Sequence, residues 1–190
     1  MAEHQSGRFL IESERSQARA IERRSGAILV ASAASSFILP LLATLVWTPP
    51  ILFVWNASSS APEGLYGIAP LAAVRRGEMV AAWLPPTARR LAARRGYLPS
   101  SVPIIKRIAA AGGDRICANR ASVLVNGRIA ATRINKDRLG REMPSWAGCL
   151  HLAAGQYLLL TNNSLSFDGR YFGVTRKDEL IGRATLIWRR

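Results

Sequence analysis

The sequence has 190 residues, of which 49% are hydrophobic, and a formal net charge of +14. This length allows one domain with an appendage, because domains usually span ~100–150 residues. The charge suggests a nucleic-acid partner, but the arginine pairs at 75–76, 89–90, 94–95 and 189–190 lack the interleaved aromatic residues of a single-strand stacking platform. We therefore expect no specific nucleic-acid partner, and the alternatives are anionic lipid headgroups or a solvated basic surface.

The first predicted element is a membrane helix at residues 26–47, within a stretch from 25 to 62 that carries no charge. These 22 residues would span ~33 Å as a helix, enough to cross a hydrocarbon core of ~30 Å. Pro40 would kink the helix and Trp47 would lie at the interface. The alternative is a cleaved signal peptide with a site at the Ala-Ser-Ala of residues 31–33, but the apolar run continues well past it.

The residues before this helix predict its orientation. Five arginines precede it: Arg8, Arg15, Arg19, Arg23 and Arg24. Because positive flanks stay in the cytoplasm, we expect residues 1–25 to be a cytoplasmic tail and residues 48–190 to form a domain on the outer side.

The outer domain is predicted to be mostly β with short helices. Strands are expected at residues 51–55 and 77–85, followed by a short helix at 87–99 with Thr87 as N-cap and Gly96 as C-cap. An apolar segment follows at 102–114, and 122–130 reads as a hairpin with Asn126-Gly127 as its type I′ turn. Two late strands are expected within 151–163 and 180–188.

The two cysteines, Cys117 and Cys149, both lie in the outer domain. An even count in an oxidising compartment predicts one disulfide, and two buried free thiols are the alternative. His151 is the only histidine near them, so the spacing of a zinc site is lacking and we expect no metal.

Lysine is rare in this chain, since only Lys106, Lys136 and Lys177 occur among 26 basic residues. Arginine cannot lose its proton in a protein, whereas a lysine that is desolvated by apolar neighbours can become a base. Lys106 lies between Ile105 and Ile108 in the apolar segment, while the other two lysines sit among charges. Lys106 is therefore the candidate general base.

Three consecutive serines, Ser58, Ser59 and Ser60, follow the strand at 51–55. A serine nucleophile needs a base. His4 lies in the predicted tail, and His151, beside Cys149, fits a structural or surface role better. A Ser-Lys dyad is therefore favoured over a Ser-His-Asp triad.

Several boxes carry a family resemblance in order along residues 25–188: NASSSAPEGLYG with RGEMV, IIKRIAAAGGD, SFDGRYFG and IGRATLIW. Together they resemble the TraF-type conjugative-transfer peptidases, a branch of the type I signal peptidases. The resemblance implies a Ser/Lys serine peptidase without a cofactor, on a largely β fold at the periplasmic side of the bacterial inner membrane.

The resemblance also assigns roles to residues. The pattern Asn-x-(Ser/Thr)-x-Ser-x-Pro-x-Gly-x-Tyr names Ser60 as nucleophile, whereas the spacing of general signal peptidases would name Ser59. In an extended chain residues two apart point to the same side, so Ser58 and Ser60 would share a site, with Ser58 as oxyanion donor. The late box implies that Ser166 and Asp168 orient Lys106. It also implies that Arg170 pairs with Asp168.

The leading hypothesis is a membrane-anchored endopeptidase that trims, or cyclises, a conjugative pilin precursor. A general signal peptidase for exported preproteins is the second interpretation. The third is a non-catalytic basic scaffold of a conjugation or type IV secretion channel. The expected partners are the prepilin or preprotein, inner-membrane lipid and components of such a channel.

Overall fold

The computed structural model describes residues 36, 38, 40–42, 44, 49–71 and 74–190. The chain divides into two compact units, Met1–Pro50 and Ile51–Arg190. In the first unit the described positions from 36 to 44 are helical. No helix within the described ranges combines the length and the hydropathy needed to cross a membrane. Most of the predicted span, residues 26–47, lies outside the described residues, so the membrane helix stays a prediction.

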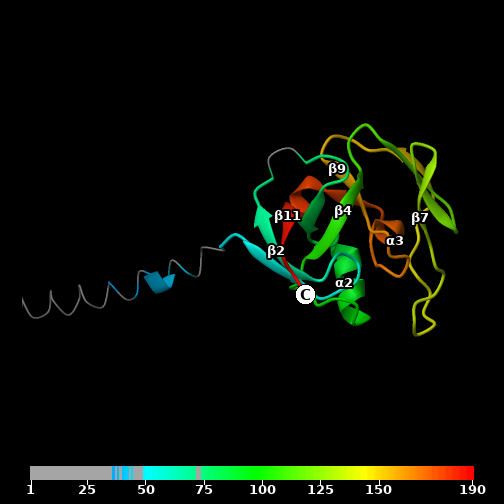
Figure 1. The fold of residues 1–190 in the computed structure, drawn as a ribbon. Helices are drawn as coiled ribbons and strands as arrows, with labels where there is room; N and C mark the ends of the chain where they lie inside the picture. Colours follow the sequence, from blue (N-terminus) through cyan, green and yellow to red (C-terminus); the bar gives the residue numbers. More distant parts are fainter. Residues whose placement is uncertain (1–35, 37, 39, 43, 45–48, 72–73) are drawn as a thin grey trace, which may run out of the picture. The chain divides into compact units, whose positions relative to one another are not determined.

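The second unit is built mainly from antiparallel strands, and the described part of it confirms the prediction of a mostly β fold with short helices (Figure 1). The larger sheet has seven strands: β1 (Phe53–Asn56), β2 (Gly64–Ala69), β3 (Met79–Ala82), β4 (Ile104–Ala110), β9 (Gln156–Leu160), β10 (Val174–Arg176) and β11 (Leu180–Arg189). Their spatial order is β1-β2-β11-β3-β4-β9-β10. The central strand β4 lies between β3 and β9, which shields its backbone on both sides.

The smaller sheet has the order β7-β6-β5-β8. Its strands are β5 (Arg115–Ala118), β6 (Ser122–Val125), β7 (Arg128–Thr132) and β8 (Gly148–His151). Asn126 and Gly127 join β6 to β7 with φ angles of 49° and 80°. Positive φ at both central residues is the requirement of a type I′ turn, so the predicted hairpin is confirmed.

The helices are short: α2 (Pro86–Arg94), α3 (Gly169–Phe172) and the 3₁₀ turn η1 (Lys177–Glu179). Helix α2 begins earlier than predicted, with Pro85 rather than Thr87 at the N-cap. Pro86 starts the helix because proline lacks an N–H that would be unpaired there anyway. Gly96, with φ of 69°, follows the last turn in the left-handed conformation.

Strand β9 connects two hydrophobic cores because its side chains alternate between faces. Leu159 packs beneath α2 with Val80 and Ile108, whereas Leu158 packs against Ile116 of the smaller sheet. A third core lies around Tyr66 on β2. Strand β9 therefore fixes the segment that follows it, residues 161–168, relative to both sheets.

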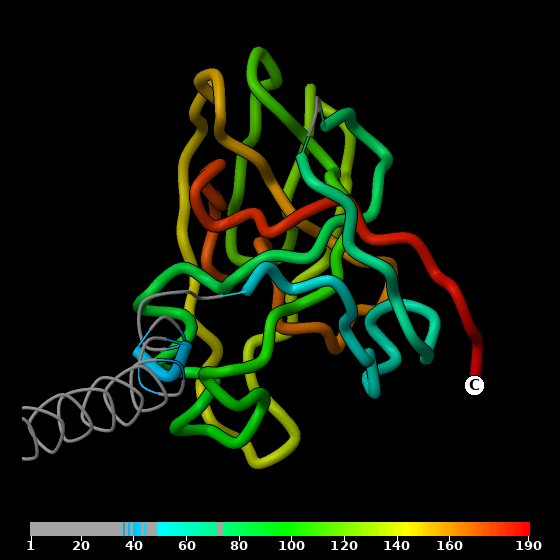
Figure 2. Tube along the Cα trace, turned by 90° about the vertical axis from the view of Figure 1, so that its left-hand side faces the viewer, coloured from blue at the N-terminus to red at the C-terminus, as the bar shows by residue number. Residues whose placement is uncertain are grey.

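The chain closes on β11, which pairs with both β2 and β3. Figure 2 shows the end of β11, in red, reaching the periphery of the unit. Strand β2 lies between β1 and β11, so the connection from β1 to β2, which holds the serine cluster, starts and ends on paired strands.

Candidate active site

The serine cluster lies in the connection between β1 and β2, where residues 59 and 60 form a turn and residues 58 and 61 are bends. The prediction that the serines lie in an extended chain was therefore wrong. Pro62 and Gly64 follow the cluster, and the Tyr66 hydroxyl donates to the Pro62 carbonyl at 2.9 Å. A buried tyrosine thus anchors the end of the turn to β2.

Asn56, the last residue of β1, organises this turn from inside. Its side chain is buried, and its Nδ2 donates to the carbonyls of Ser58 (2.9 Å), Ala61 (3.0 Å) and Pro62 (3.1 Å). Its Oδ1 accepts from the Ser58 hydroxyl at 2.9 Å and from the Ser58 backbone N–H at 3.3 Å. One amide therefore replaces the backbone pairing that an extended strand would have supplied.

The hydroxyls of Ser58 and Ser60 form a hydrogen bond of 2.7 Å. The two serines therefore share a site, as predicted from alternation along a strand, but a turn brings them together. Because the Ser58 hydroxyl donates to Asn56, its oxygen is left to accept the proton of Ser60. Hydrogen bonds from Ser60 to Ser58 and from Ser58 to Asn56 therefore hold both hydroxyls in defined positions.

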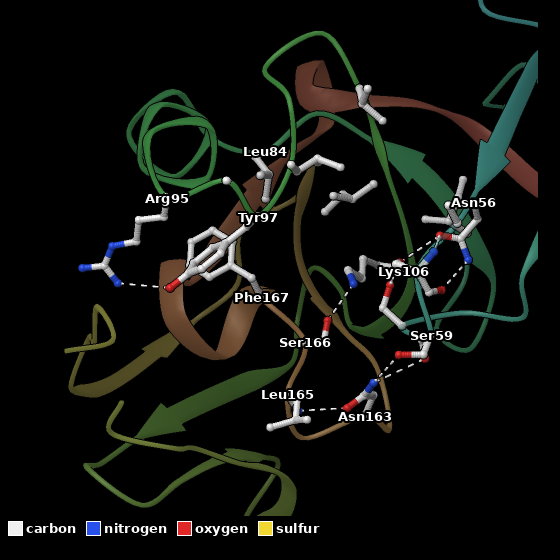
Figure 3. Close-up of a pocket in the computed structure, with 18 of the residues that line it drawn as sticks. Asn56, Ser59, Leu84, Arg95, Tyr97, Lys106, Asn163, Leu165, Ser166 and Phe167 are labelled. Carbon is white, nitrogen blue, oxygen red and sulfur yellow. Dashed lines mark hydrogen bonds between the residues drawn. The ribbon is translucent and has the colours of Figure 1, made fainter. Parts of the chain in front are cut away.

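Ser59 has a different partner from its neighbours. Asn163 Nδ2 donates to its hydroxyl oxygen at 3.0 Å and more weakly to its carbonyl at 3.4 Å (Figure 3). Ser59 therefore ties the turn to the segment after β9 and does not join the Ser58–Ser60 pair.

Lys106, on the central strand β4, is buried with only 3% of its surface exposed. Its ammonium donates to Ser166 Oγ at 2.7 Å, and among the described residues no hydrogen bond joins it to Ser60 (Figure 3). Burial lowers the pKa of Lys106 from 10.5 to about 8, the Asp168 charge opposes this shift, and the Arg170 charge adds to it. The ammonium therefore loses its proton far more readily than an exposed lysine.

Asp168 and Arg170 form a fully buried ion pair at the start of α3, with Nε to Oδ1 at 2.8 Å and Nη2 to Oδ2 at 3.0 Å. Asp168 also caps α3 by accepting from the Arg170 backbone N–H at 3.1 Å. The carboxylate is thus occupied by Arg170. It acts on Lys106 through its charge, because only Ser166 accepts a hydrogen bond from the ammonium in the described structure.

Two residues that the sequence did not single out support α3 from the smaller-sheet side. Arg133 donates from Nε to the Arg170 carbonyl at 2.7 Å and lies over the Trp146 ring at 5.3 Å. Trp146 donates from its ring N–H to the Gly169 carbonyl at 3.0 Å. No sequence motif marks these residues. By contrast, Asn56 is part of the serine box, and that was the available signal for its role.

The groups proposed for the site line one cleft of about 790 Å³. The serine turn, Lys106 and Ser166 line it, together with Asn163 and Leu165 (Figure 3). A second hollow of about 380 Å³ is lined by Ser59 and Ser60 as well. The serine turn therefore lies between two hollows, which gives a bound peptide room on either side of it.

The remaining predicted residues lie away from this cleft. Cys117 and Cys149 form a disulfide between directly opposed residues of β5 and β8. His151 is exposed at the end of β8 and does not line the cleft. Lys136, 64% exposed at its side chain, pairs with Glu142 at 3.7 Å. Among the three lysines, only Lys106 is buried.

The site is therefore a cleft lined by one buried lysine and a cluster of serines. The model of the signal peptidase family, peptidase S26, matches residues 25–189. The chain therefore belongs to this family of serine peptidases.

Its relatives place it in the TraF-type branch of that family. Two plasmid transfer proteins TraF from Escherichia coli are 33% and 29% identical to it over 147 residues, which cover 70% of this chain and 82% of each relative. A crystal structure of a signal peptidase I from Enterococcus faecalis is 18% identical, covers 60% of this chain and 98% of that one, and superposes with a TM-score of 0.36. The resemblance noted from the sequence boxes is confirmed.

Proposed function

We propose that the chain is a membrane-anchored serine endopeptidase in which Ser60 is the nucleophile, Lys106 the general base and Ser58 an oxyanion donor. The observation that carries this proposal is the burial of Lys106, with its lowered pKa, in the same cleft as the paired hydroxyls of Ser58 and Ser60. Ser59 is a weaker candidate because its hydroxyl is engaged by Asn163.

In the proposed reaction each of these groups has one role. Ser60 Oγ attacks the peptide carbonyl and its proton passes to neutral Lys106. The oxyanion accepts from the Ser58 hydroxyl, which rotates away from Asn56, and from the Ser60 backbone N–H. The tetrahedral adduct collapses to an ester on Ser60, and the ammonium of Lys106 returns its proton to the departing amine. Water, deprotonated by Lys106, or an amine then attacks the ester and frees Ser60.

Ser166 and Asp168 act on Lys106 in this scheme. The hydrogen bond to Ser166 at 2.7 Å fixes the direction of the lysine amine. The charge of Asp168 stabilises the ammonium that forms during attack, and its own position is held by Arg170. Both are positioning residues, because they act through the lysine.

Membrane attachment is supported by an apolar surface on β1 and β11. Trp55 and Trp188, 46% and 56% exposed, flank Leu65 in register and their rings lie 5.7 Å apart. Exposed Phe53 and Ile187 extend the surface. Tryptophan is favoured at the boundary of the hydrocarbon core. We propose that this surface contacts inner-membrane lipid, with residues 26–47 as the anchor and the second unit on the periplasmic side.

The proposed substrate is a conjugative pilin precursor, supported by the similarity to plasmid transfer proteins. The acyl-enzyme is shared by hydrolysis and by cyclisation, in which the amine of the same pilin replaces water. The test is co-expression of a conjugative plasmid's pilin precursor with the full-length protein and its variants, with intact-mass analysis of the product. A cyclic product is one water lighter than the linear one.

The variants separate the assigned roles. Ser60→Ala should abolish processing, whereas Ser59→Ala should retain it. Lys106→Arg keeps the charge and removes the base, so processing should fall by at least ~10³-fold. Processing by Ser60→Ala, or by Lys106→Arg at the wild-type rate, would overturn the proposal.

A further inference from the structure

The cleft continues beyond Lys106 to a wall that is rich in arginine. Phe167 follows Ser166 and lies 5.4 Å from the Tyr97 ring, centroid to centroid. Arg95 donates from Nη1 to the Tyr97 hydroxyl at 3.3 Å (Figure 3). Arg138 and Arg141 line the same cleft. We call Arg95, Arg138 and Arg141 the arginine wall.

The one carboxylate among the described residues that line this cleft is Asp137, and its acceptor sites are occupied. Arg141 Nε donates to it at 2.6 Å, and the Tyr97 hydroxyl donates to the same oxygen. The backbone N–H groups of Leu139 and Arg141 each donate to the other oxygen at 2.9 Å. Asp137 therefore holds Arg141 in place and does not neutralise the other two guanidinium groups.

Arg95 and Arg138 keep most of their hydrogen-bonding capacity. Among the described contacts, the Arg95 guanidinium bonds only a neutral hydroxyl, and the Arg138 side chain has neither a hydrogen bond nor an ion pair. Three guanidinium groups thus face one carboxylate at this end of the cleft. Guanidinium groups bind carboxylates through parallel hydrogen bonds, so the wall suits an anionic group of the bound chain.

We propose that the arginine wall is a specificity subsite for a carboxylate of the substrate, with Arg95 and Arg138 making the contacts and Arg141 held by Asp137. This inference rests on the proposed peptidase function of the cleft. An extended peptide advances ~3.3 Å per residue and alternates its side chains, so one position relative to the scissile bond faces the wall. The carboxylate comes either from an Asp or Glu side chain there or from a free C-terminus.

The test measures binding without turnover. Full-length Ser60→Ala protein in detergent micelles is titrated with a series of fluorescent, alanine-rich dodecapeptides. Each peptide carries one Glu at a different position, and its partner carries Gln at the same position. Each peptide is made with a free and an amidated C-terminus. One Glu position, or the free C-terminus, should bind about 3–10-fold more tightly than its neutral partner, because a partly exposed charge pair contributes modestly.

Further variants of the Ser60→Ala protein test whether the arginine wall causes the tighter binding of charged peptides. Arg95→Gln and Arg138→Gln together should abolish the difference between charged and neutral peptides, whereas lysine at both positions should retain part of it. Arg94→Gln is the matched control, because Arg94 is exposed on α2 and does not line the cleft. Thermal melting verifies that each variant is folded.

The two sources of the carboxylate and the two proposals give separate outcomes. If affinity depends on the position of Glu, the carboxylate comes from a side chain. If affinity is lost on amidation, the carboxylate is a free C-terminus. Equal binding of charged and neutral peptides throughout, or discrimination that survives the double glutamine variant, overturns the subsite. Failure of wild type to process the pilin precursor would instead overturn the proposed pilin processing, whatever the peptides show.

Discussion

The seven-stranded and four-stranded sheets bury different kinds of residue. The larger sheet carries buried Lys106 on its central strand and buried Asn56 at its edge. In the smaller sheet, every residue of β8 is exposed and Ala131 is the one buried residue of β7. A disulfide joins two of its strands instead.

The difference shows where each sheet obtains its stability. Cores lie around the larger sheet on both sides of β9, so its apolar burial offsets the cost of polar groups inside it. The smaller sheet buries only one face and gains a covalent link in place of a second core. Arg170 connects the two, because its guanidinium bonds the Thr132 carbonyl of β7 and the Thr161 carbonyl after β9.

The largest expected effect is the loss of this connection in Arg170→Met. The change leaves Asp168 buried without its counter-charge, so the free energy of unfolding should fall by about 3–5 kcal/mol. Urea denaturation at pH 7 measures it. The control Arg128→Met removes an exposed arginine of β7 and should be near neutral. A loss below ~1 kcal/mol for Arg170→Met would mean that the pair does not join the sheets energetically.

Removal of the disulfide should destabilise the unit nearly as much. Cys117→Ala with Cys149→Ala opens a cross-link over a sequence separation of 32, and the expected loss is about 2–4 kcal/mol. Amide hydrogen exchange should accelerate more in β5 and β8 than in β3 and β4. Uniform acceleration would contradict the separate stabilisation of the sheets, and a reducing agent should leave the double variant unchanged.

Local chemistry explains what could be predicted from the sequence. The Asn126-Gly127 turn depends only on its own backbone preferences, and the burial of Lys106 could be inferred from its apolar neighbours. Strand β2 was missed because Gly64 and Gly67 weaken the pattern of a strand. These glycines are needed by the tertiary structure, since a Cβ at Gly64 would lie 2.0 Å from the Trp188 carbonyl oxygen.

Long-range contacts explain what could not be predicted. Ser59 and Asn163 are 104 residues apart in sequence, and Arg133 reaches Arg170 across 37 residues. Neither pair has a local signature. The serine turn was misread for a related reason, because the side chain that shapes it, Asn56, acts through hydrogen bonds to carbonyls up to six residues away.

A smaller loss is expected for Asn56→Ala, which tests the polar interior of the larger sheet. The substitution leaves the carbonyls of the serine turn without their shared donor. The free energy of unfolding should therefore fall by about 1–3 kcal/mol. Processing should fall more steeply than stability, because Ser58 and Ser60 lose their order. Asn135→Ala removes an exposed asparagine that lines neither hollow, and it is the control in both thermal melting and the pilin assay. Wild-type processing by Asn56→Ala would show that the turn forms without the amide.

The smallest expected change in the free energy of unfolding has the opposite sign, because Lys106→Met should stabilise the larger sheet. The same substitution should abolish processing. The pKa of Lys106 is about 8 in the folded chain against 10.5 for an ordinary lysine. Folding therefore disfavours the ammonium, at a cost of about 3 kcal/mol at neutral pH, since each pKa unit corresponds to ~1.4 kcal/mol. Loss of the hydrogen bond to Ser166 offsets about 1 kcal/mol or more of the gain, which leaves a net gain of about 1–2 kcal/mol.

The pH dependence of that gain identifies its cause. The cost of holding the ammonium is full below pH 8, declines as the pH rises toward 10.5, and vanishes above it, because both states are then neutral. Urea denaturation of wild type and Lys106→Met across this range should therefore converge at high pH. Exposed Lys136→Met should show no such trend. A gain for Lys106→Met that is independent of pH would indicate improved packing by methionine, and the buried charge would then not explain the difference between the sheets.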